Sequence, residues 1–316
     1  MDTEVTKRMI DFVGHRKIFY GISAGLVALV VILSLVLGVQ LDISFKGGCM
    51  VTYSATQEIS SGDVDKAVES AIHETVSVQT SQDIKTGKQS IIVTLVGTKS
   101  LSTDQQADMT AAMEKAFPDA GIQVEGTTNV DASMGMEFLL KCVIAVVLAS
   151  ILMLIYIGLR FRKIGGMSAG CMAVVALLHD TMMVYAAFVI FRFPLDSNFI
   201  AAILTILGYS INDTIVIYDR VRENERLYGR GLDNAQLINK SLNQSLTRTV
   251  HTTVTTVIAL LVVSIVALIF RVNSILTFTV PLIVGMASGL YTSTCLTTTL
   301  WYSWQEHKAK TKANSR

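Results

Sequence analysis

Six long apolar blocks limit the folds that this chain of 316 residues can adopt. Hydrophobic residues make up 51% of the sequence and charged residues only 16%. Each block has about 20 residues, the length that an α-helix needs to cross the hydrocarbon core of a bilayer. The sequence therefore predicts a polytopic α-helical membrane protein with six transmembrane helices, at residues 18–39, 138–159, 166–191, 198–218, 250–270 and 275–302.

Lysine and arginine are distributed unevenly among the segments that connect the blocks. They concentrate in residues 1–17, 160–165, 219–249 and 303–316, whereas the two opposite turns carry only Arg192 and Arg271. Because basic residues gather on the cytoplasmic side of membrane proteins, both termini are predicted to be cytoplasmic. The first block is longer than a signal-peptide core and no small-residue cleavage site follows it, so we expect it to remain as an anchor.

Residues 40–137 form a polar insertion after the first span, and the predicted orientation places it outside the cytoplasm. Apolar residues alternate as in β-strands at 49–55, 76–82, 91–96 and 122–128, and they have helical spacing at 61–74 and 103–117. The order strand, helix, strand, strand, helix, strand predicts a ferredoxin-like βαββαβ domain of the α+β class.

The predicted cytoplasmic loop 219–249 contains a second amphipathic pattern. Ala235, Ile238, Leu242 and Leu246 recur at spacings of three and four, with polar residues between them. This pattern indicates a helix that lies in the membrane interface. A short helix that packs on the cytoplasmic ends of the bundle fits the pattern equally well.

An acid interrupts the fourth span, where Asp213 follows Asn212. A carboxylate inside a bilayer costs roughly 2.5 to 3.5 kcal/mol on insertion scales, so it indicates a pathway or a partner. Arg248 enters the fifth span from the same side, and at similar depth it would hold Asp213 ionised until a proton or a conformational change separated them. Alternatively, Arg248 reaches the lipid headgroups and Asp213 is a buried polar residue bonded to hydroxyls.

The third span carries two further ionisable residues, His179 and Asp180. Neighbours on a helix point about 100° apart, so we expect that they cannot both face one partner. One would line the bundle and the other would cap a local network. No second histidine or carboxylate follows His179 at helical spacing, so a metal site is not predicted.

Several functional classes have no support in the sequence. Three cysteines lie in apolar blocks and only Cys49 lies in the polar insertion, which therefore has no internal disulfide. Nucleotide-binding and hydrolase motifs are absent, as is a basic patch with interleaved aromatic residues. We therefore expect no enzyme activity, cofactor or nucleic-acid partner. With an acid inside the membrane, the proton gradient is the expected energy source.

Three motifs make the chain resemble the SecF family of the bacterial SecDF protein-export complex. They are the pair 179–180, the run 208–224, and the stretch 41–48, whose signature residues at the base of the external domain are Asp42, Phe45, Gly47 and Gly48. The resemblance covers essentially the full length, including the six spans and the single large insertion. The SecD half is absent from this chain, so SecD is expected to be a separate polypeptide.

The resemblance implies a subunit of the bacterial cytoplasmic (inner) membrane, related to the proton-driven exporters of the RND superfamily. Its implied partners are SecD as heterodimer partner, the SecYEG translocon and the translocating preprotein. The pair would use the proton motive force to complete secretion after the ATP-driven SecA stage. The family's proton pathway falls on Asp213 and Arg248, and Asn212, His179 and Asp180 are further candidates.

Two other functions remain open at this point. An RND-type small-molecule exporter subunit would share the acid in the membrane, although an insertion of this size is small for a substrate channel. A structural assembly subunit that conducts no protons would use Asp213 only for packing.

Overall fold

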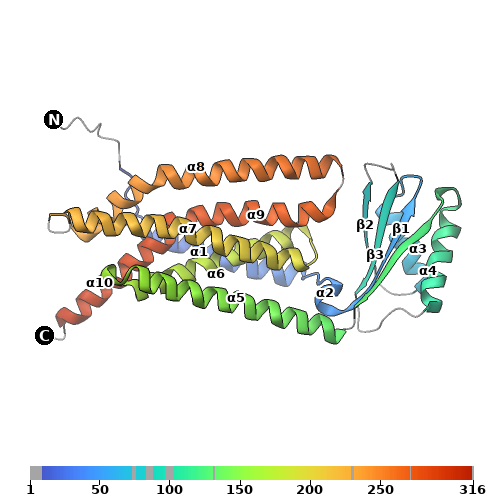
Figure 1. The fold of residues 1–316 in the computed structure, drawn as a ribbon, viewed down its shortest axis with the longest axis horizontal. Coiled ribbons are helices and arrows are strands. Elements are labelled where there is room, and N and C mark those ends of the chain that lie inside the picture. The colour runs from blue at the N-terminus through green and yellow to red at the C-terminus, as the bar shows by residue number, and fades with distance from the viewer. Residues whose placement is uncertain are drawn as a thin grey trace.

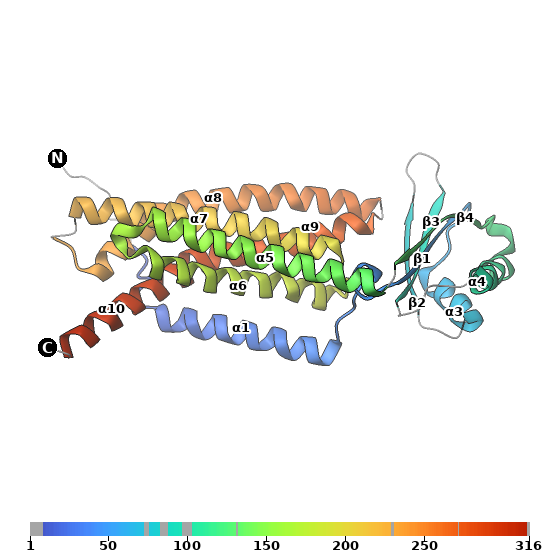
Figure 2. The same cartoon turned by 60° about the horizontal axis from the view of Figure 1, so that its bottom comes forward.

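The structure is a computed structural model and describes residues 9–72, 76–82, 88–96, 103–130, 132–228, 231–270 and 272–314. A bundle of long helices forms one end of the molecule, and a small sheet covered by two helices forms the other (Figure 1). The start of α1 and all of α10 lie at the end of the bundle far from the sheet (Figure 2). This arrangement agrees with an insertion and two termini on opposite sides of a membrane.

Six helices in the described part of the chain are long and apolar enough to cross a membrane, as the sequence predicts. The sixth runs from α9 through a π-helical turn into α10 without a break. The bundle consists of α1 Arg16–Leu37, α5 Ala132–Arg160, the short 3₁₀ turn η2 Arg162–Ile164, α6 Gly166–Phe191, α7 Ser197–Tyr228, α8 Asn234–Ile269, α9 Asn273–Tyr291, the π-helical turn Thr292–Thr297 and α10 Thr298–Asn314.

Helices α6 and α7 form the interior of the bundle. In their most apolar windows 56% and 50% of the residues are buried, against 11% in α1 and in α8. Small residues allow α5 to lie directly on α6: a Cβ at Gly166 would lie 2.5 Å from the carbonyl oxygen of Gly158, and one at Gly170 would lie 2.9 Å from Leu154. Polar residues on α6 and α7 are thus shielded from the surroundings.

The C-terminal end of α7 and the start of α8 correct the prediction for residues 219–249. This segment is not a loop with a separate interfacial helix, because α7 continues to Tyr228 and α8 begins at Asn234. Ile238 and Leu242 are buried in the bundle core. The polar face is covered by the N-terminal segment, since the side chain of Asn239 accepts the backbone N–H of Val13 at 3.0 Å. The alternative of a helix packed on the bundle is therefore confirmed.

The inserted domain is a four-stranded antiparallel sheet with α3 Ser61–Ile72 and α4 Thr103–Ala116 packed against it (Figure 1). Along the chain the elements run β1, α3, β2, β3, α4, β4, and the strand order in the sheet is β2-β3-β1-β4. The strands are β1 Gly48–Ala55, β2 Val76–Gln82, β3 Gln89–Val96 and β4 Gln123–Val130, with the 3₁₀ turn η1 Pro118–Ala120 before β4.

The core of this domain lies between the sheet and the two helices. Tyr53 pairs with Ile91 on β3 and with Val124 on β4, and Tyr53 and Ile91 are fully buried. Met109 and Met113, one turn apart on α4, complete the apolar layer. The first helix was predicted to end at residue 74; it is described to Ile72, and residues 73 and 74 lie outside the described residues.

Candidate functional site

Asp180 is a fully buried carboxylate at the centre of the bundle. It accepts hydrogen bonds from the hydroxyls of Ser210 on α7 at 2.7 Å and Ser288 on α9 at 2.6 Å. Thr292, the first residue of the π-helical turn, donates to both of its oxygens at 2.9 Å. Three neutral donors from two other helical segments therefore satisfy this acid, and they tie α6, α7 and α9 together.

His179 shares a partner with Asp180, which corrects the expectation that the two cannot face one group. The hydroxyl of Ser288 lies 3.3 Å from His179 Nδ1 and 2.6 Å from Asp180 Oδ1. The small residues of α9 bring its backbone close to α6, and one hydroxyl then reaches both side chains. His179 Nε2 is buried and has no hydrogen-bond partner among the described residues.

The π-helical turn brings Thr292 into reach of Asp180. The hydroxyl of Thr297 donates to the carbonyl of Thr292, five residues earlier, at 3.0 Å. One turn before, Gly289 faces the same group, since a Cβ there would be in ordinary van der Waals contact with Ser210, at 3.4 Å, and with Asp180 Oδ2, at 3.7 Å. A π-turn within an α-helix is a feature found often at functional sites.

Asp213 lies on the same face of α7 as Ser210, three residues further along the helix. Only 4% of Asp213 is exposed, and its Oδ2 atom has no hydrogen-bond partner within the described ranges. With a rise of about 1.5 Å per residue, it is offset by roughly one helical turn from the Asp180 cluster toward the C-terminal end of α7. Its environment is therefore the reverse of that of Asp180, whose carboxylate is fully bonded.

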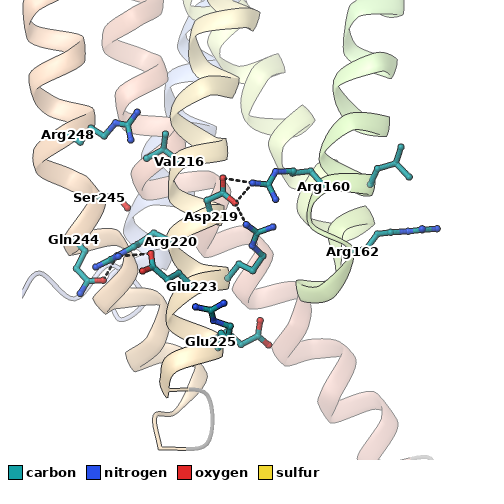
Figure 3. Close-up of a pocket in the computed structure, with 13 residues that line it drawn as sticks. Arg160, Arg162, Val216, Asp219, Arg220, Glu223, Glu225, Gln244, Ser245 and Arg248 are labelled. Atoms are coloured by element: carbon teal, nitrogen blue, oxygen red, sulfur yellow. Dashed lines mark hydrogen bonds and ion pairs between the residues drawn. The ribbon is translucent and has the colours of Figure 1, made fainter.

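Arg248 is near Asp213 without contacting it. Its charge acts electrostatically on the Asp213 carboxylate, but no ion pair within 4.0 Å joins them in the described structure. The side chain extends from α8 toward Val216, one turn beyond Asp213 on α7 (Figure 3). Asn212 is exposed, points about 100° away from Asp213 around α7 and does not join the cluster. The structure thus brings Asp213 and Arg248 to neighbouring positions and leaves Asn212 outside.

A cavity of about 1160 Å³ opens beside Arg248, between the ends of α5, α7 and α8 (Figure 3). Asp219 lies in its wall and pairs with Arg160 at 3.1 Å and with Arg222 at 2.9 Å. The sequence analysis did not predict this cluster of Asp219 with its arginine partners, although the density of arginines around residue 219 indicates it. It also missed Ser210, which no periodic pattern separates from other hydroxyl residues in the spans.

The family model for the C-terminal part of the protein export membrane proteins SecD and SecF matches residues 108–307. The chain belongs to the SecD/SecF family. The protein translocase subunit SecF of Alicyclobacillus acidocaldarius is 30% identical over 96% of each chain. Agreement over the whole length places this chain on the SecF side of the family.

Larger SecDF proteins contain a counterpart of this chain. The protein translocase subunit SecDF of Bacillus subtilis is 32% identical over 95% of this chain and 39% of that protein. The crystal structure of SecDF from Thermus thermophilus superposes with a TM-score of 0.77 at 26% identity, over 96% of this chain and 40% of that chain. The chain therefore spans less than half of each SecDF protein.

The SecF signature stretch forms the connection between the first span and the external domain. Asp42 caps the short helix α2 Ile43–Lys46, because its carboxylate accepts the backbone N–H of Ser44 at 2.9 Å. Gly47 and Gly48 follow with φ angles of 80° and 143°, which favour glycine. A Cβ at Gly48 would lie 2.0 Å from the carbonyl oxygen of Leu95. The two glycines therefore allow β1 to leave the membrane directly beside β3.

Phe45 links this connection to the second span. Only 2% of Phe45 is exposed, and its ring stacks on that of Phe138 on α5 with centroids 5.8 Å apart. A Cβ at Gly135 would lie 2.9 Å from the Phe45 backbone. The base of the inserted domain is thus packed on the start of α5.

A short β-bridge adds a third attachment. The backbone N–H of Asp42 donates to Leu195 at 3.0 Å, and that of Leu195 donates to Gln40 at 2.8 Å. Asp196 lies beside this bridge, in the turn before α7. Burial raises the pKa of Asp196 above its usual range, and the nearby Asp42 carboxylate raises it further. The external domain is therefore connected to α1, α5 and the turn between α6 and α7.

Replacing Gly48 by alanine is expected to destabilise the external domain by roughly 2 to 4 kcal/mol, because the new Cβ strains the backbone and overlaps a ladder carbonyl. Hydrogen exchange of the β1 and β3 amides, measured on the membrane-embedded protein, would become faster. Gly126→Ala on β4 is the matched control, since nothing lies within 4 Å of its Cβ position. Equal exchange in both variants would contradict this account of the signature.

Proposed function

We propose that the chain is a proton-coupled accessory subunit of the Sec protein translocase, paired with SecD in the bacterial cytoplasmic membrane. Its membership of the SecD/SecF family supports the pathway, and the larger SecDF relatives support SecD as the partner. One observation carries the coupling: Asp213 is a buried carboxylate in a spanning helix, with an oxygen that no described residue satisfies. Such a group is a site where a proton can bind.

The proton step uses Asp213 and the neighbouring Arg248. In the ionised state the carboxylate attracts the guanidinium, and this attraction favours close packing of α7 and α8. A proton that arrives from outside binds to the Asp213 carboxylate and neutralises it. Arg248 is then released from this attraction, and solvent in the cavity that it lines compensates its charge. Loss of the proton to the cytoplasm restores the attraction.

Asp180 and His179 have a different part in the same pathway. Three hydroxyls already donate to the Asp180 carboxylate, so we assign it to holding α6, α7 and α9 together near the Asp213 face of α7. His179, with a buried ring nitrogen that lacks a partner among the described residues, is the member of the pair that can still form a hydrogen bond. Ser210 connects the two regions, because it contacts Asp180 and lies one turn from Asp213.

The external domain is assigned to the ferredoxin-like class, and we propose that it transmits motion to the translocating preprotein beside SecYEG. The assignment is supported by the antiparallel strand order β2-β3-β1-β4 with both helices packed on the sheet. Support for the transmission comes from the three attachments at its base, of which Phe45 on α5 is the most buried. Both termini would lie in the cytoplasm.

Export measured in inverted membrane vesicles from cells depleted of the chain tests this function. Depletion is expected to slow the gradient-dependent completion of preprotein export into inverted membrane vesicles, and to leave ATP-driven initiation unchanged. Complementation with the wild-type chain restores the rate. If export is unaffected and efflux of a small molecule is lost instead, the exporter alternative holds. If the translocase complex falls apart on depletion, the structural alternative holds.

A further inference from the structure

The cavity between α5, α7 and α8 contains more positive charge than its own carboxylates neutralise. Six arginines line it, against three carboxylates. Arg160 and Arg222 share Asp219, and Arg220 pairs with Glu223 at 2.7 Å. The other three arginines, from η2, α7 and α8, form no ion pair among the described residues: Arg162, Arg226 and Arg248.

This charge is arranged around a volume that a ligand can enter. The cavity holds about 1160 Å³. Guanidinium groups reach it from helices on both sides, with Arg160 from α5 and Arg248 from α8 (Figure 3). Arg160 points toward Asp219 in the cavity wall and Arg248 points toward Val216, whereas Arg162 extends outward, away from α7 and α8 (Figure 3). Guanidinium groups match the oxygens of a phosphate well, because they donate two parallel hydrogen bonds.

We infer that this cavity binds the phosphate headgroup of an anionic phospholipid from the cytoplasmic leaflet. Basic pockets between membrane helices on this side are typical binding sites for such headgroups. In the proposed orientation, the cavity lies at the level where the headgroups begin. The excess positive charge selects an anionic lipid over a zwitterionic one.

The surfaces next to the cavity favour a lipid over a soluble phosphate. On α5, Ile151, Ile155 and Leu159 are between 47% and 60% exposed. On α8, Ile258 and Val262 are 54% and 56% exposed. Helix α7 lies between α5 and α8 in both views (Figures 1 and 2). Acyl chains can therefore pack on these apolar side chains while the phosphate stays at the arginines.

Lipid retained by the purified complex of this chain with SecD tests the site. The complex is reconstituted in nanodiscs of phosphatidylcholine with a minor share of phosphatidylglycerol or cardiolipin, and bound lipid is measured by native mass spectrometry after release into detergent. The test variant is Arg162→Gln with Arg226→Gln, because both side chains are exposed and neither is in the proposed proton step. Lys308→Gln, an exposed cytoplasmic charge outside the cavity, is the matched control.

The wild type and the control are expected to retain anionic lipid in preference to phosphatidylcholine. Each arginine removed should weaken that retention roughly fivefold, since a basic residue near the surface contributes about 1 kcal/mol. Equal retention in the test variant and the control would overturn the proposal. So would displacement of the lipid by inorganic phosphate alone, or a crosslink from residue 162 to SecD that shows the partner filling the cavity. Thermal unfolding of each variant verifies that the fold is intact.

Discussion

Replacing Asp213 by asparagine is expected to stop the gradient-driven stage of export while leaving the complex assembled. Asparagine keeps the size and polarity of the side chain but cannot bind and release a proton. The variant should therefore behave at all times like the protonated state. A charged carboxylate inside the membrane costs several kcal/mol, so the thermal stability of the variant is expected to equal or exceed that of the wild type.

The measurement is preprotein completion in inverted vesicles that contain the SecD complex, with an imposed proton gradient and no ATP. We expect the rate for Asp213→Asn to fall to that of vesicles without the chain. Thr205→Val is the matched control, because this residue is exposed on the same helix. Its hydroxyl donates to the carbonyl of Ala201, one turn earlier, and to no other group among the described residues. Export by Asp213→Asn at the wild-type rate would falsify the coupling.

Arg248 adds a second measurement to the same experiment. Its charge disfavours the protonated form of Asp213, so Arg248→Gln should allow Asp213 to keep its proton at a lower outside proton concentration. Export by this variant is expected to lose its dependence on the outside pH, while the complex stays assembled. An unchanged pH profile would separate the guanidinium from the proton step and leave it as a wall residue of the cavity.

The two acids of the bundle could be predicted from the sequence, because the free-energy cost of a charge in the membrane depends on its own apolar block. A charged residue in an apolar block of about 20 residues is costly wherever the helix packs, so Asp180 and Asp213 stand out by composition alone. The difference in hydrogen bonding between the two carboxylates could not be predicted in this way. Asp180 is fully bonded and Asp213 is not, and this depends on Ser210, Ser288 and Thr292 reaching one point from separate segments.

Tertiary contacts also determine the structure at the end of α7 and the start of α8. The pattern at Ile238 and Leu242 predicts an amphipathic helix, but it does not tell whether lipid, bundle or chain covers the polar face. Asn239 and Asn243 bind the backbone of residues 10–13, which lie more than 220 positions away in the sequence. A single-sequence pattern contains no information on such a pairing, so the two interpretations of this segment could not be separated.

Replacing Asp180 by leucine is expected to have the largest effect on stability. Three buried hydroxyls would lose their acceptor, and each unsatisfied group costs about 1 to 3 kcal/mol. Thr292 recovers part of this, because it also bonds to the carbonyl of Gly289 at 3.3 Å. We therefore expect a loss of roughly 3 to 5 kcal/mol, seen as a lower unfolding temperature of the detergent-solubilised SecD complex.

A matched set of variants separates this structural role from loss of the proton pathway. Adding Ser210→Ala and Ser288→Ala to Asp180→Leu removes two of the unpaired donors, and replacing both sides of a buried hydrogen bond by apolar groups is nearly neutral. The combined variant should regain much of the stability but not gradient-driven export, because the Asp180 carboxylate near the Asp213 face of α7 is still absent. Recovery of both would show that Asp180 only holds the helices together. A combined variant no more stable than Asp180→Leu alone would mean that the hydroxyls do not depend on this carboxylate.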